Sequence, residues 1–194
     1  MNLNELFPKQ QKLDDYIVKE KGLEGQDLLS RKIVALICEL YECVNEGRWF
    51  KFWSDDMKPR GKALTCINCG FRMKNGSRYS EGDGHCNEIG DMHYHNPLLE
   101  EYVDTIHFAL SIANDLGVHE HKYIHTQPAD LNELVIGITN IATILPMSKD
   151  KHHVASLLNN LITLGYQLGF TEQDVIQAYD DKNRENYKRQ DNGY

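Results

Sequence analysis

The sequence predicts an all-α fold, a multi-helix bundle of one domain spanning residues 1–194. Three observations support this. Apolar residues recur every three or four positions in several long segments. Helix-capping residues precede those segments, and Gly or Pro follows them. Strand-like alternation of apolar and polar residues is rare. A Gly-, Cys- and His-rich insert at about 55–96 separates the second main helix from the third.

Composition narrows the class of protein. The formal net charge of −8 disfavours a nucleic-acid polymer as partner, because such binding depends on neutralising phosphates. We see no apolar run of the roughly 18 residues that a membrane span needs, and Met1–Glu20 does not resemble a signal peptide. We therefore expect no membrane partner and a cytoplasmic location. There the five cysteines are expected to be thiols or metal ligands.

The first two helices are expected on either side of a glycine-containing break. Leu3–Lys19 has near-helical apolar spacing, with Pro8 either in the first turn or interrupting the segment. Asp27 is a plausible N-cap for a second helix at Leu28–Glu46, and Gly47 can end it.

The later helices are bounded by similar signals. Asn96 followed by Pro97 is a favourable helix start, and Thr171–Asp174 resembles a capping box. The expected helices run from Pro97 towards Gly117, from Thr126–Pro128 to Pro146, from Lys151 to Leu168, and from Thr171 to about Gln190.

Two acidic pairs indicate a metal site. Each pair is spaced three apart on a helix, so both of its carboxylates project from one face. The pairs are Glu39 with Glu42, and Glu101 with Asp104. Four carboxylates at close range repel one another unless a cation such as Mg²⁺ lies between them. Ordinary solvated surface acids are the alternative, but apolar residues crowd around both pairs, which favours the metal site.

Basic residues near the C-terminus suggest phosphate binding. Lys182, Asn186 and Arg189 share one helical face and could clamp a phosphate chain. They could equally be a charged last turn that complements the helix dipole. The aromatic run Arg48–Ser54, which includes Lys51 and Trp53, could be plain core or one wall of a base-binding pocket. Gln10 is a candidate reader of a base edge, although nothing local singles it out.

The insert contains residues suited to zinc. Cys66 and Cys69 form a Cys-x-x-Cys-Gly turn, and Cys86 could be a third ligand. The fourth ligand would have to come from His85, His93 or His95. The alternative is a module that simply contains thiols. Cys38 and Cys43 lie within a helix and are expected to be small core residues.

Together these motifs resemble the dimeric dUTPases of the all-α NTP pyrophosphohydrolase superfamily. The matching segments are LFPKQQKLD with Gln10, ELYECVNE, RWFKFW, EEYVDTIHF and YDDKNRENYKRQ. The resemblance implies Mg²⁺-dependent hydrolysis of dUTP and dUDP to dUMP. It also implies a homodimer, in a bacterial cell or a phage-infected bacterial cell.

The resemblance also implies roles for individual residues. Glu39, Glu42, Glu101 and Asp104 would hold two or more Mg²⁺ ions, and Glu42 would also deprotonate the attacking water. Six residues and Lys51 would bind substrate: Gln10 and Trp53 at uracil, Phe108 near the sugar, and Lys182, Asn186 and Arg189, assisted by Lys51, at the phosphates.

Two alternatives remain open. One is a MazG-like pyrophosphohydrolase with the same metal site and a different base preference. The other is a protein-binding module that uses the insert. The 43 residues between Trp53 and Pro97 exceed what a plain connection needs, so the insert could dock a protein partner.

Overall fold

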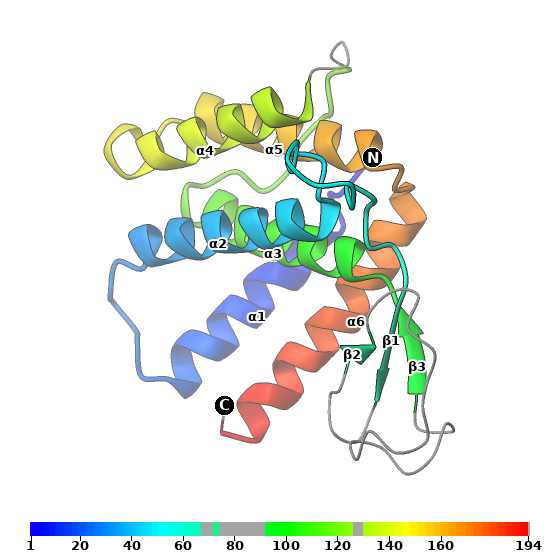
Figure 1. The fold of residues 1–194 in the computed structure, drawn as a ribbon. Coiled ribbons are helices and arrows are strands. Elements are labelled where there is room, and N and C mark those ends of the chain that lie inside the picture. The colour runs from blue at the N-terminus through cyan, green and yellow to red at the C-terminus, as the bar shows by residue number, and fades with distance from the viewer. Residues whose placement is uncertain (67–71, 74–91, 126–129, 194) are drawn as a thin grey trace.

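The structure, a computed structural model, describes residues 1–66, 72–73, 92–125 and 130–193. Within them six helices stack in three layers (Figure 1). The helices are α1 (Leu6–Glu20), α2 (Leu29–Gly47), α3 (Pro97–Asp115), α4 (Leu131–Ser148), α5 (Lys151–Gln167) and α6 (Glu172–Asp191). The middle layer holds α2 and α3, with α4 and α5 on one side and α1 and α6 on the other. Helix α3 contacts α1, α2, α5 and α6, and the all-α expectation is confirmed.

Helix starts follow the predicted capping signals closely. The Asn96 side chain accepts a hydrogen bond from the Leu99 amide at 3.2 Å, and Thr171 and Asp174 form the reciprocal capping box. Pro8 lies in the first turn of α1. Asp27 accepts from the Leu29 amide at 3.0 Å, although Leu28 holds the N-cap position, so α2 starts one residue later than expected.

Two helix ends differ from expectation. Gly47 is the last residue of α2, and Arg48 adopts the left-handed φ of 62°. Gly47 is needed for space, because a Cβ there would collide with the Trp49 ring. Pro146 does not close its helix; α4 continues to Ser148 and ends where Lys149 turns left-handed, with φ of 47°. Thr126 and Pro128 lie outside the described residues, and Asp130 caps α4.

The insert contains a small antiparallel sheet of β1 (Ala63–Cys66), β2 (Arg72–Met73) and β3 (Met92–His95), in the order β2-β1-β3. Ala63 pairs with His95, two residues before α3 begins. The two ends of the insert therefore lie side by side, so the insert can be accommodated with little effect on the bundle. Of the predicted zinc ligands, Cys69, His85 and Cys86 lie outside the described residues, and Cys66 and His93 lie in β1 and β3.

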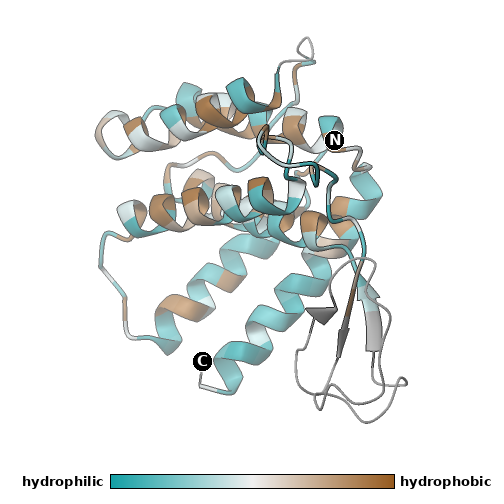
Figure 2. Ribbon diagram, viewed as in Figure 1, coloured by the Kyte–Doolittle hydropathy of each residue, from teal (hydrophilic) through white to brown (hydrophobic). Residues whose placement is uncertain are grey.

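Apolar side chains from all six helices and from the N-terminus form one core, while α1 and α6 present mainly hydrophilic residues (Figure 2). Cys43 is buried, but Cys38 is exposed, so the core expectation for Cys38 was wrong. Five positions along a helix turn the side chain by about 140°, which places the two thiols on different sides of α2. Among the described residues α4 alone is long and apolar enough to cross a membrane, a test that core helices of soluble proteins also pass.

Candidate active site

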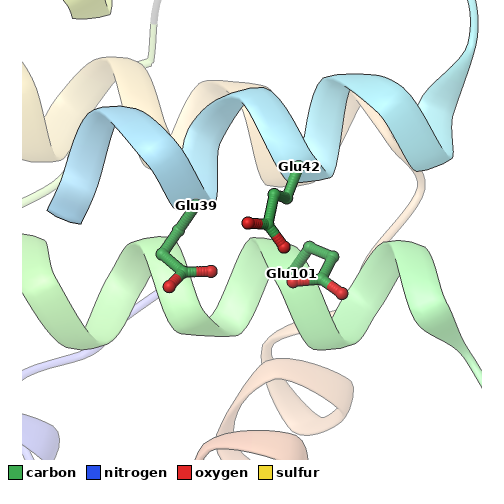
Figure 3. A group of neighbouring side chains, drawn as sticks. All are labelled: Glu39, Glu42 and Glu101. Atoms are coloured by element: carbon green, nitrogen blue, oxygen red, sulfur yellow. The ribbon is translucent and has the colours of Figure 1, made fainter.

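The two acidic pairs face each other across the contact between α2 and α3. Carboxylate oxygens of Glu39, Glu42 and Glu101 lie within 4.8 Å of one another, and Figure 3 shows the three side chains converging between the helices. Glu42 is exposed, and the other two are half-buried. The predicted meeting of the acidic pairs is thus confirmed for these three residues.

Burial and mutual repulsion disfavour the charged forms of these carboxyls. Burial, followed by the charges of Asp104 and Glu42, raises the pKa of Glu39 to about 7. Burial, followed by the charge of Asp104, also raises the pKa of Glu101 to about 7. The cluster therefore lacks sufficient positive charge of its own, and a bound cation would stabilise it.

Asp104 is held by a different partner. Its carboxylate lies 2.8 Å from the Lys182 ammonium on α6, which also lies 3.6 Å from a Glu100 oxygen. Only 14% of the Asp104 side chain and 12% of the Lys182 side chain are exposed. Burial opposes the charged form of Lys182, but the charge and hydrogen bond of Asp104 raise its pKa overall. Lys182 thus brings the predicted phosphate-binding face to the predicted metal site.

The other predicted residues of α6 lie on the same side of the bundle. Arg189 binds Glu185 one turn earlier. Its positive charge, like that of Lys182, opposes the rise in pKa of Glu39 and Asp104. Asn186 is half-buried between these two cations along the helix.

The aromatic run divides between core and surface. Trp49 and Phe50 pack against the core, whereas Trp53 is 65% exposed. The Lys51 ammonium lies 5.4 Å from the centre of the Phe50 ring. Phe108 is half-buried on α3 against the core. The core alternative therefore holds for Trp49 and Phe50, whereas a base-binding role for the exposed Trp53 stays a prediction.

Gln10 lies in a buried polar network that sequence reasoning missed. Its side chain contacts His107 on α3 and Tyr179 on α6, neither of which was predicted as a site residue. The sequence around Phe108 drew attention to that position, but the neighbouring His107 faces inward. Only the pairing of helices distant in sequence could reveal its partners.

A helical bundle with clustered carboxylates on paired helices and basic residues on a third fits a nucleotide-hydrolysing enzyme of the all-α type. A family model described as dUTPase matches residues 2–65 and 90–194. The chain therefore belongs to the all-α dimeric dUTPase family, whose activity is that of a dUTP diphosphatase. No match was found among curated proteins.

The match passes over residues 66–89, which fall inside the insert. All predicted catalytic, Mg²⁺-binding and substrate-binding residues lie in the matched segments, whereas the zinc candidates Cys66, Cys69, His85 and Cys86 do not. The dUTPase resemblance and dUTP hydrolysis are thus confirmed, while the roles of individual residues remain predictions.

Proposed function

We propose that the protein hydrolyses dUTP and dUDP to dUMP in a Mg²⁺-dependent reaction, with pyrophosphate as the other product from dUTP. The convergence of Glu39, Glu42 and Glu101 within 4.8 Å carries this proposal. Three oxygen donors around Mg²⁺ lie about 3 to 4 Å apart, since each metal–oxygen bond is about 2.1 Å. Small side-chain rotations would bring the cluster to that spacing, so the residues fit the ion.

The proposed division of roles follows burial and charge. Bound Mg²⁺ would neutralise charge on the phosphate oxygens during the reaction. Glu42 is the most exposed carboxylate of the cluster, and it would accept the proton of the attacking water. Lys182, Asn186 and Arg189, with Lys51, would bind the phosphates.

The proposed base and sugar contacts come from three other elements. Gln10 on α1 and Trp53 after α2 would contact uracil. Phe108 on α3 would lie against the deoxyribose, where an apolar ring disfavours an added hydroxyl.

We also propose that the protein is a homodimer that uses the outer face of α4. Ile136 and Met147 on this face are 57% and 87% exposed. A groove of about 230 Å³ adjoins it, between α4 and the end of α2, lined by Tyr41, Val44, Asn45, Trp49, Phe50, Asn132, Val135 and Ile136. A second copy would remove this apolar surface from water.

A nucleotide panel tests the proposed activity. Purified protein is given each dNTP and dUDP, with Mg²⁺ or with EDTA, and product release is measured. We expect turnover of dUTP and dUDP well above that of other dNTPs, and no turnover in EDTA. A profile that is flat across bases, or that favours a purine, would instead support the MazG-like alternative.

The variant Glu42→Gln tests whether turnover depends on this site. Loss of a general base costs about 10² to 10⁴ in rate, and this residue is also a proposed ligand. Substitution of the exposed Glu20 on α1 by Gln is the matched control and should leave turnover unchanged. A fully active Glu42→Gln enzyme would refute the assigned base.

A further inference from the structure

A buried polar network joins α1, α3 and α6. Its five members are Gln10, Asp14, His107, Ser111 and Tyr179. Gln10 and His107 are each only 4% exposed. Buried polar groups are costly unless paired, so the partners of each atom restrict the orientation of the side chains.

The hydrogen bonds fix the orientation of the Gln10 amide. Its Oε1 accepts from the Tyr179 hydroxyl at 2.7 Å and lies 2.8 Å from Nδ1 of His107. Its Nε2 donates to the Asp14 carboxylate at 2.7 Å. The Ser111 hydroxyl donates to the other Asp14 oxygen at 2.6 Å. A flipped amide would place its oxygen against the Asp14 carboxylate, where neither oxygen atom can donate.

The same bonds determine the state of His107. An amide oxygen can only accept, so Nδ1 of His107 must carry the ring proton. Burial, followed by the charge of Lys182, lowers the pKa of His107 to about 3, so the ring is neutral near pH 7. Nε2 is then an acceptor, and it has no hydrogen-bond partner among the described residues.

The network is in register with the ion pair of the active site. The His107 ring stacks on Tyr179 with centroids 3.9 Å apart and planes at 11°. His107 lies three residues after Asp104 on α3, and Tyr179 lies three residues before Lys182 on α6. The ring stack and the Asp104–Lys182 pair are thus successive contacts between two antiparallel helices.

We propose that His107 and Tyr179 are positioning residues that set the base specificity of the enzyme by locking the Gln10 amide. This rests on the proposed role of Gln10 at uracil. With Oε1 bound twice and one N–H given to Asp14, Gln10 retains a single N–H for substrate. That donor matches a carbonyl oxygen of uracil. The same donor would face the exocyclic amine of cytosine, which is also a donor. Only a flipped amide, with its oxygen towards the base, could accept a hydrogen bond from that amine.

Three variants separate the ring stack from the hydrogen bonds. His107→Phe keeps the stack and removes one donor to Gln10, and Tyr179→Phe removes the other. Loss of one such bond corresponds to about a five- to tenfold effect. We expect each variant to raise KM for dUTP by that factor, with kcat within about twofold, and to lower the preference for dUTP over dCTP. His107→Asn, whose amide can donate in place of Nδ1, should recover part of that preference.

A measurement without substrate tests the lock itself. Nitrogen NMR of histidine-labelled protein should show one neutral ring with its proton on Nδ1, a signal absent from His107→Phe. A proton on Nε2 would overturn the proposal. So would unchanged KM and base preference in folded His107→Phe and Tyr179→Phe. Failure of the proposed function is distinguishable, because wild-type protein itself would then show no preference for dUTP.

Discussion

Helices α3 and α4 are nearly equal in length, but α3 buries most of its residues although several are polar, whereas α4 leaves most of its residues at least partly exposed although nearly all are uncharged. Helix α3 carries several acidic residues and His107, yet most of its residues are buried. Helix α4 has Glu133 as its one charged residue, yet only five of its 18 residues are buried. Ile136, Ile144 and Met147 of α4 stay exposed instead.

The contrast shows two uses of surface in one bundle. Half-buried carboxyl groups on α3, such as those of Glu101 and Asp104, are costly unless ions or hydrogen bonds compensate them, which supports a site that binds cations. Exposed apolar residues on α4 cost solubility unless another surface covers them, which supports the proposed dimer interface on this helix.

The largest effect is expected on α4. Substitution of Ile136 by Glu would place a charge in the proposed dimer interface, at a cost of several kcal/mol. We expect the dimer to dissociate at concentrations where wild-type protein is fully dimeric, as measured by analytical ultracentrifugation. Each folded monomer should keep its helical circular dichroism spectrum.

The control is the same substitution at Ile124, which is 69% exposed on the connection before α4. Ile124→Glu should leave the association unchanged. If wild-type protein is monomeric, or if both variants remain dimeric, the exposed face of α4 is not the interface.

A smaller effect, with two opposite signs, is expected at Lys182. In the metal-free protein its ammonium neutralises Asp104. Lys182→Met should therefore bind Mg²⁺ alone severalfold more tightly, because the competing cation is gone. The same variant should bind α,β-imido-dUTP about 10- to 100-fold more weakly, because a charged phosphate contact is lost. Isothermal titration calorimetry measures both.

Lys188→Met is the matched control, since Lys188 is exposed on the same helix. It should change neither affinity appreciably. A Lys182→Met variant that binds both Mg²⁺ and nucleotide more weakly would mean that the lysine only stabilises the fold.

Local signals explain how much could be predicted from the sequence. The capping box at Thr171 and the Asn96 cap are short-range hydrogen bonds, so the residue types alone suffice to place them. The meeting of Glu39 and Glu42 with Glu101 was also predictable, because a spacing of three fixes the face of each helix.

Long-range contacts explain the rest. The network around Gln10 joins residues about 100 and 170 positions apart, and no local pattern encodes such pairs. The same is true of the Asp104–Lys182 pair. Because of this pair, Asp104 has a cationic partner of its own, which the expected cluster of four carboxylates did not include. Gly47 was expected to end α2, but the reason that this position lacks a Cβ, contact with the Trp49 ring, could be read only from the structure.

The smallest effect concerns the pH dependence of stability, and it tests the α3 half of the contrast. Glu39 and Glu101 have pKa values of about 7 in the folded protein, against an ordinary value of 4.5. The folded state therefore binds more protons than the unfolded state between these values. The free energy of unfolding of metal-free protein should fall as pH rises from about 4.5 to 7, on the order of 1 kcal/mol per carboxyl after solvent screening.

Urea unfolding in EDTA at pH 5 and pH 8 measures this fall, and Glu39→Gln should reduce it because an amide does not titrate. Glu24→Gln, an exposed change outside the cluster, should retain the wild-type fall. Added Mg²⁺ should restore stability at pH 8 and have little effect at pH 5, where protons occupy the carboxyls that the ion needs. Equal stabilisation by Mg²⁺ at both pH values would mean that the ion binds elsewhere, and the half-buried acids of α3 would then need another explanation.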